Sequence, residues 1–142
     1  MFEFYKEDGR IKIKIFGIKV VFKNPFINRL EDCCAINNLP YLKKQGTIFP
    51  HPVGIVVGKG VEIGKNCTIF QNVTIGKWND AVPKIGDNVK IYANSVIYGD
   101  TTIGNNAVIG AGSVVTKSVP DNAVVVGNPA KIIKFREDIQ NV

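Results

Sequence analysis

An aliphatic residue returns at every sixth position from Val57 to Val115, and this spacing constrains the fold more than any other feature of the chain. The column consists of Val57, Ile63, Ile69, Ile75, Ile85, Ile91, Ile97, Ile103, Ile109 and Val115, with one slip of four residues after Ile75. A period of six matches neither the ~3.6-residue turn of an α-helix nor the two-residue alternation of a strand. It predicts a solenoid in which three short strands form one triangular coil of about eighteen residues.

A second column of residues supports the solenoid. The fourth position after most of the aliphatic residues is small or β-branched, so it can fill the space between stacked corners. The column consists of Val61, Cys67, Val73, Val89, Ser95, Thr101, Ala107 and Ser113. Glycine often follows the aliphatic residue, and Asn or Asp stands just beyond it, as corners with unusual φ and ψ require. The two columns together predict an all-β fold.

The rows from Ile103 to Val115 (Ile-Gly-Asn-Asn-Ala-Val-Ile-Gly-Ala-Gly-Ser-Val-Val) resemble those of the hexapeptide-repeat acyltransferases. The resemblance implies a left-handed parallel β-helix, whose hand the period alone does not give. We therefore expect an N-terminal cap over residues 1–45, a β-helical acyltransferase domain over residues 46–133 and a C-terminal tail over residues 134–142.

The cap has its own pattern. Apolar and basic residues alternate over residues 10–23 about Phe16-Gly17, which predicts a β-hairpin with isoleucines on one face and lysines on the other. A short helix is expected over residues 26–38, closed by Leu39-Pro40. Such a segment covers the open end of a solenoid. The alternative is that its lysine face contacts a membrane surface or an anionic glycolipid.

Composition indicates a cytoplasmic protein. The chain has no apolar run near the ~18 residues that span a bilayer, and acids in its first eight residues do not fit a secretory leader. The net charge of +6 suits an anionic partner, but the lysines are dispersed without interleaved aromatics, so nucleic acid is not expected. Cys33, Cys34 and Cys67 have neither disulfide nor metal-ligand spacing, and we expect no metal.

The single histidine, His51, stands between Pro50 and Pro52 just before the repeat begins. It lies six residues before Val57, so a core-filling role is one alternative, but flanking prolines disfavour a regular strand. Histidine can accept a proton from an attacking hydroxyl near neutral pH. We therefore expect His51 to be a general base, oriented by an acid of the cap (Glu31 or Asp32) or by a backbone carbonyl.

The run from His51 to Gly58, followed by Ile69–Gly76 and Pro83–Gly86, resembles the core of serine O-acetyltransferases and related sugar O-acetyltransferases. The resemblance implies direct transfer of acetyl from acetyl-CoA to a hydroxyl, with His51 as base and a backbone N–H near Gly76 at the oxyanion. It also implies a homotrimer with sites between subunits. A cysteine nucleophile is the competing mechanism, which the core position of Cys67 disfavours.

The same resemblance implies an acetyl-CoA site made of small corner residues and two lysines. Ala93 and Ala111 match corners where the pantetheine arm lies against the backbone, and Lys117 and Lys131 offer charge to phosphate. The full expected set is Gly76, Ala93, Ala111, Thr116, Lys117, Pro129 and Lys131.

The four-residue slip, Lys77-Trp-Asn-Asp80, predicts a loop thrown out from a corner, and such loops often form binding faces. We expect Trp78 and Asp80 to contact the acceptor, because an exposed indole can stack on a sugar ring. The alternative is that Trp78 packs against a neighbouring subunit.

Three departures from the serine enzymes bear on the acceptor. Val82 stands where they carry a second histidine, Pro50 stands where they carry an aspartate, and their long helical domain is replaced by about 45 residues. A sugar or polysaccharide hydroxyl is therefore the preferred acceptor, with serine as the alternative.

A zinc carbonic anhydrase of this fold is disfavoured, because it needs three histidines. A non-catalytic scaffold, which would not bind CoA, is the alternative of another class.

Overall fold

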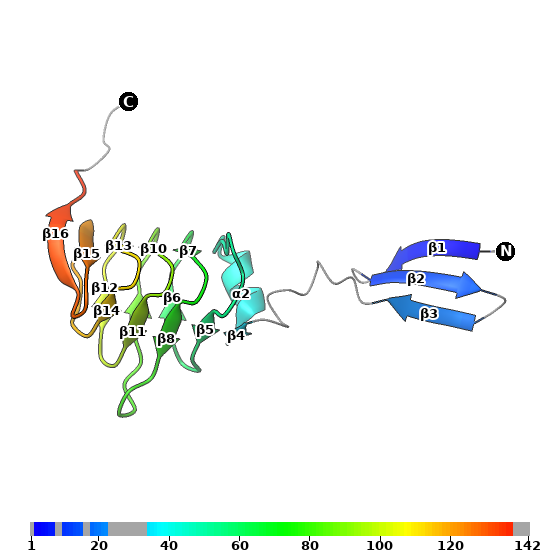
Figure 1. The fold of residues 1–142 in the computed structure, drawn as a ribbon, viewed down its shortest axis with the longest axis horizontal. Coiled ribbons are helices and arrows are strands. Elements are labelled where there is room, and N and C mark those ends of the chain that lie inside the picture. The colour runs from blue at the N-terminus through cyan, green and yellow to red at the C-terminus, as the bar shows by residue number, and fades with distance from the viewer. Residues whose placement is uncertain (1, 8–9, 16–17, 23–33, 138–142) are drawn as a thin grey trace.

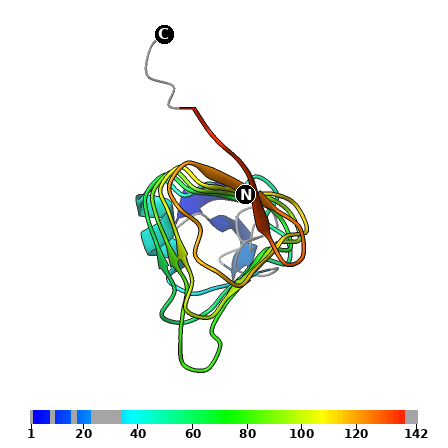
Figure 2. The same ribbon diagram turned by 90° about the vertical axis from the view of Figure 1, so that its left-hand side faces the viewer.

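The computed structural model describes residues 2–7, 10–15, 18–22 and 34–137, and shows side chains over the last of these ranges. Residues 34–137 form a parallel β-solenoid whose coils stack side by side (Figure 1) and enclose a triangular prism (Figure 2). The prism has three faces, each a sheet of short strands contributed by successive coils.

The strands follow one another round the prism in chain order. The first face contains β4 (Ala35–Ile36), β5 (Val56–Val57), β8 (Thr74–Gly76), β11 (Val96–Tyr98) and β14 (Val114–Val115). The second face contains β6 (Glu62–Ile63), β9 (Lys84–Ile85) and β12 (Thr102–Ile103). The third face contains β7 (Thr68–Ile69), β10 (Lys90–Ile91), β13 (Val108–Ile109), β15 (Ala123–Val126) and the antiparallel β16 (Lys131–Phe135).

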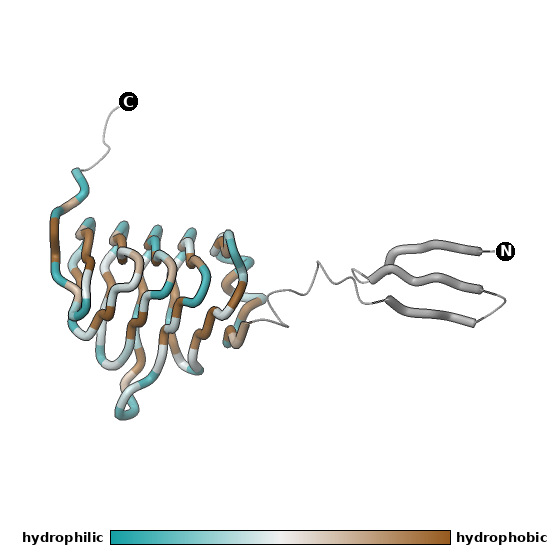
Figure 3. Tube along the Cα trace, viewed as in Figure 1, coloured by the Kyte–Doolittle hydropathy of each residue, from teal (hydrophilic) through white to brown (hydrophobic). Residues whose placement is uncertain are grey.

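Both predicted columns are confirmed as the core. Every member of the six-residue column is buried, and so is every member of the second column except Val61, which is half-buried. Equivalent residues of successive coils pair in register, as Ile69 does with Ile91 and Ile91 with Ile109. Figure 3 shows the resulting brown apolar stretches along the coils. The core is therefore a stack of layers of aliphatic side chains.

One corner of the prism, between the second and third faces, is held by a ladder of amides. Asn66, Asn88, Asn106 and Asn122 occupy it in successive coils, each with φ between 54° and 61°, a region that asparagine tolerates better than most residues. Asn88 Nδ2 donates to Asn106 Oδ1 (3.2 Å), and Asn106 Nδ2 donates to Asn122 Oδ1 (3.0 Å). This corner therefore has a structural role.

The cap differs from its prediction. The helix, α2 (Leu39–Lys44), begins where a helix was expected to end, because Pro40 fits the first turn of a helix, where its fixed φ and missing N–H cost little. Residues 35–38 are not helical: β4 pairs with β5 instead. The remainder of the predicted helix lies outside the described residues. Leu39 and Leu42 are buried, so α2 and β4 cover the first coil.

The N-terminal residues form a separate antiparallel sheet of β1 (Phe2–Glu7), β2 (Arg10–Ile15) and β3 (Ile18–Phe22). The predicted hairpin is confirmed as the β2–β3 pair, and β1 was not predicted. Whether this sheet covers the solenoid or meets a membrane stays a prediction. Within the described ranges, no helix is long and apolar enough to cross a bilayer.

We predict that Ile97→Ala will lower the free energy of unfolding by about 2 to 5 kcal/mol, because Ile97 is fully buried in the middle of the stack and truncation leaves a cavity. Urea denaturation followed by circular dichroism measures the loss. Lys90→Ala, on an exposed position of β10, is the control and should change stability by less than about 0.5 kcal/mol. Equal effects of the two substitutions would contradict the layered core.

Candidate active site

His51 lies on the surface, in the irregular segment that precedes β5. Its carbonyl accepts a hydrogen bond from the Val53 N–H (2.8 Å), which closes a tight bend between the two flanking prolines. The side chain is exposed, so the core-filling alternative is wrong. The prolines explain this outcome, because they prevent the regular strand that would have turned the imidazole inward.

His51 shares its corner of the prism with two aromatic residues from the next coils. Phe70 lies 6.3 Å from His51 between ring centroids, with the rings inclined at 45°. Tyr92 stacks on Phe70 at 4.8 Å, with the rings at 12°. We call His51, Phe70 and Tyr92 the aromatic corner; it lies between the third and first faces. Sequence reasoning missed the two aromatic rings, although each directly follows a residue of the buried column.

The aromatic corner continues into a row of small residues. Gln71, Ala93 and Ala111 are equivalent in successive coils, since the Asn94 N–H donates to Gln71 O and the Gly112 N–H donates to Ala93 O. Ala93 is half-buried and Ala111 is exposed. The Gln71 Oε1 atom is buried without a hydrogen-bond partner among the residues described. The structure thus brings the two predicted pantetheine corners to the same edge as His51.

The predicted loop lies at a different corner, between the first and second faces, where it projects from the prism (Figures 1 and 2). Trp78 is 61% exposed, and it exchanges two backbone hydrogen bonds with Ala81 (2.9 and 3.0 Å). Asp80 forms an ion pair with Lys77. The Trp78 ring lies 5.8 Å from that of Tyr98, inclined at 58°. The loop is therefore a closed turn that presents an indole to solvent.

The two corners are separated by the width of the first face. The chain crosses this face from Asn72 to Gly76 through β8, and this crossing spans roughly 13 Å at the ~3.3 Å rise per residue of a strand. Within one chain, the structure therefore does not bring Gly76, Trp78 and Asp80 together with His51. A site that used both groups would combine two chains.

The remaining residues of the predicted acetyl-CoA site lie in the last coil, some at the loop corner and some at the aromatic corner. All of them are exposed. Thr116 and Lys117 follow β14, on the side of the loop. Pro129 lies in the turn that bonds to Val114, on the side of the aromatic corner, and Lys131 follows it at the start of β16.

Cys67 does not have the environment of a nucleophile. Its side chain is fully buried, and its thiol donates to Gly86 O at 3.2 Å. Burial raises the pKa of the Cys67 thiol, so the reactive thiolate is disfavoured. Cys34 is half-buried near the first coil, and Cys33 lies outside the described residues. Among the described side chains, no three potential metal ligands cluster together.

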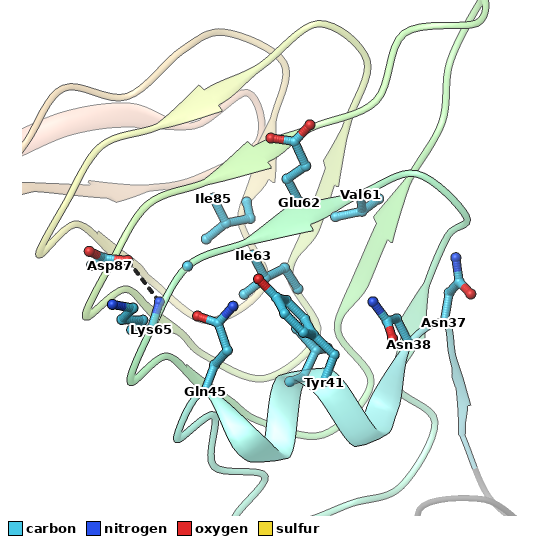
Figure 4. A pocket seen from close by; sticks show the side chains of 12 residues that line it. Asn37, Asn38, Tyr41, Gln45, Val61, Glu62, Ile63, Lys65, Ile85 and Asp87 are labelled. Carbon is cyan, nitrogen blue, oxygen red and sulfur yellow. Dashed lines mark hydrogen bonds between the residues drawn. The ribbon is translucent and has the colours of Figure 1, made fainter.

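A groove of about 520 Å³ lies between α2 and the second face. Figure 4 shows it, with Tyr41 of α2 and Gln45 just after this helix on one side and β6 with Glu62 on the other, while the Lys65 N–H bonds to the Asp87 carboxylate (2.7 Å). No predicted site residue lines it. The candidate active site is therefore an exposed edge of one chain rather than an enclosed cavity.

Comparison with known proteins agrees with the fold and with the predicted family. The family model described as bacterial transferase hexapeptide (six repeats) matches residues 83–117. The mitochondrial serine acetyltransferase 3 of Arabidopsis thaliana is 42% identical over 116 residues, which cover 78% of this chain and 30% of that protein. The chain thus spans less than a third of the length of this relative.

Solved structures give the same result. A serine acetyltransferase in complex with CoA is 40% identical with a TM-score of 0.59, and the match covers 61% of this chain and 37% of that one. Soybean serine acetyltransferase complexed with serine is 44% identical with a TM-score of 0.59, again over 61% and 37% of the two chains.

Residues 83–117 therefore carry the repeat of the bacterial hexapeptide transferases, and the fold is the left-handed parallel β-helix that the resemblance implied. The proteins described above to which the chain is similar are serine acetyltransferases.

We predict that Cys67 will resist alkylation by iodoacetamide at pH 8 in the folded protein and will react once urea unfolds it, because its thiol is buried with a raised pKa. Mass spectrometry of tryptic peptides measures the extent of labelling, with the partly exposed Cys34 as the internal control. Rapid labelling of Cys67 in the native protein would reopen the cysteine mechanism.

Proposed function

We propose that the chain carries the catalytic domain of an acetyl-CoA-dependent O-acetyltransferase whose acceptor is serine. The observation that carries the proposal is the exposed His51, held in a proline-flanked bend at one edge of a β-helix related to those of serine acetyltransferases. One of the similar serine acetyltransferase structures is a complex with CoA, and another is a complex with serine. These relatives support serine over the sugar hydroxyl that the sequence departures favoured.

In the proposed reaction, the His51 imidazole accepts the proton of the serine hydroxyl while its oxygen attacks the thioester carbonyl of acetyl-CoA. The tetrahedral intermediate collapses with release of the CoA thiolate, which takes up the proton from the imidazolium. The products are O-acetylserine and CoA, and no acyl-enzyme forms. The fully buried Cys67, with its raised thiol pKa, supports direct transfer over a cysteine relay.

The acetyl-CoA site is assigned to the small residues beside the aromatic corner. Ala93 and Ala111 leave the edge of the prism bare beyond Tyr92, and a Cβ added at Gly112 would meet nothing within 4 Å. An extended pantetheine arm can therefore lie against the backbone there. Lys131 is an exposed cation on the same side of the last coil, which suits the phosphate end of the cofactor, whereas Lys117 lies at the loop corner and would be supplied by a neighbouring copy.

A homotrimer is part of the proposal, because one chain does not complete the site. His51 and the loop with Trp78 stand at opposite edges of the first face. Packing the edge of one prism against the neighbouring prism would bring the loop of one copy to the histidine of another. Gly76, at the base of the loop, would then place a backbone N–H near the oxyanion.

A sugar hydroxyl is the second candidate acceptor. Trp78 favours it, because the indole is 61% exposed and presented by a closed turn, as a stacking platform for a sugar ring would be. Release of CoA measured with serine and with a panel of monosaccharides distinguishes the two acceptors. Failure to bind CoA at all would favour the non-catalytic scaffold.

We predict that His51→Ala will retain acetyl-CoA binding and lose a factor of about 10² to 10⁴ in kcat, because the general base is removed while the cofactor edge is unchanged. The assay follows CoA release spectrophotometrically with serine as acceptor. Circular dichroism controls for folding, which an exposed side chain should affect little. Turnover equal to that of the wild type would refute the assignment of His51.

We also predict that Ala111→Trp will abolish acetyl-CoA binding, because an indole at this exposed corner would fill the path of the pantetheine arm. Isothermal titration of both proteins with acetyl-CoA measures the effect. Lys90→Trp places the same bulk on the third face, away from the proposed path, and should bind like the wild type. Binding by Ala111→Trp with unchanged affinity would show that the cofactor lies elsewhere.

A further inference from the structure

Among the described residues, His51 has no orienting partner, and Glu31 and Asp32, which were expected to supply one, lie outside them. No described residue forms a hydrogen bond or ion pair with its imidazole, and the side chain is exposed. The backbone is well fixed, since prolines stand on both sides and the His51 carbonyl bonds to the Val53 N–H. The freedom that remains is rotation about the two side-chain torsions, which would spread the imidazole over several staggered orientations.

One contact restricts that rotation. The Phe70 ring lies 6.3 Å from the imidazole at an inclination of 45°, in the range of a specific tilted aromatic pair. Phe70 reaches this position from the next coil, where its own N–H bonds to Ile91 O (3.0 Å). The contact therefore joins the irregular segment that carries the histidine to the regular part of the solenoid.

Phe70 is itself held in place. Tyr92 stacks on its far side at 4.8 Å and 12°, and the Tyr92 N–H bonds to Ile109 O (2.9 Å) in the following coil. Phe70 is half-buried, whereas the imidazole is exposed. The Phe70 ring that contacts His51 is thus held by residues of two successive coils. The backbone hydrogen bonds between these coils fix their relative positions.

We propose that Phe70 is a positioning residue, which holds the His51 imidazole in one orientation through ring packing. The inference rests on the proposed function, because it concerns the base of that reaction. General-base catalysis requires the imidazole nitrogen within hydrogen-bond reach of the acceptor hydroxyl. A misplacement of about 1 Å costs roughly 10²-fold in rate.

The test compares Phe70→Leu with Phe135→Leu. Leucine keeps the apolar character of position 70 but removes the flat ring, and Phe135 is an exposed phenylalanine of β16 at the far end of the solenoid. We expect Phe70→Leu to lower kcat by about 10- to 100-fold with the KM for acetyl-CoA changed by less than about twofold. Phe135→Leu should behave like the wild type, and Phe70→Tyr, which restores a ring, should recover most of the rate.

A second measurement does not depend on activity. The chain has one histidine, so its imidazole proton resonances are identified without assignment of the whole spectrum. We expect a nuclear Overhauser effect between the His51 and Phe70 ring protons in the wild type. In Phe70→Leu, the His51 resonances should move toward those of an unstructured peptide, because the ring current is lost, and in Phe135→Leu they should stay in place.

The outcomes separate this inference from the proposed function. Loss of kcat together with the change in the His51 resonances supports the positioning role. An active wild type in which Phe70→Leu keeps full kcat, or in which the His51–Phe70 contact is absent from the spectrum, overturns the inference and leaves the function standing. A wild type that shows the contact and transfers no acetyl group overturns the proposed function, and with it any catalytic role for Phe70.

Discussion

The structure depends on the burial of one aliphatic side chain by each short strand of the coil. A parallel strand such as β7 or β10 has two residues, too few to be stable alone, and its backbone bonds only to the equivalent strands of neighbouring coils. The strands of one coil therefore cannot form their backbone hydrogen bonds without the neighbouring coils. The core side chains of one coil are also covered only when a coil lies on each side of them. Stability comes from stacking, and the regular period of six in the sequence is the requirement that stacking imposes.

Because the faces are occupied by this repeat, chemistry is confined to the corners, and the three corners differ. One is closed by the asparagine ladder that bonds coil to coil. Another carries the aromatic corner and the row of small residues, and the third carries the loop with Trp78. Irregularity is tolerated at the latter two because the core columns continue undisturbed beneath them.

The features with a strong local sequence pattern were predicted correctly. The exposure of His51 followed from its flanking prolines, and the loop followed from the slip after Ile75. The end of the cap was misjudged, because Pro40 can either stop a helix or start one, and only the packing of Leu39 and Leu42 selects the start. Phe70 and Tyr92 were missed because the slip between their coils breaks their sequence spacing, although they stack in space.

The sequence by itself determined the coil, the inward columns and the positions where the repeat is interrupted, since these depend on local spacing and on the conformational limits of proline, glycine and asparagine. Only the tertiary structure decided which interruptions meet. The hydrogen-bonded register of the coils places His51 against Phe70 and puts Trp78 on the opposite edge of the first face. The place of a residue around the prism relative to residues of other coils is set by the stacking of the coils, and a single stretch of sequence does not determine this stacking.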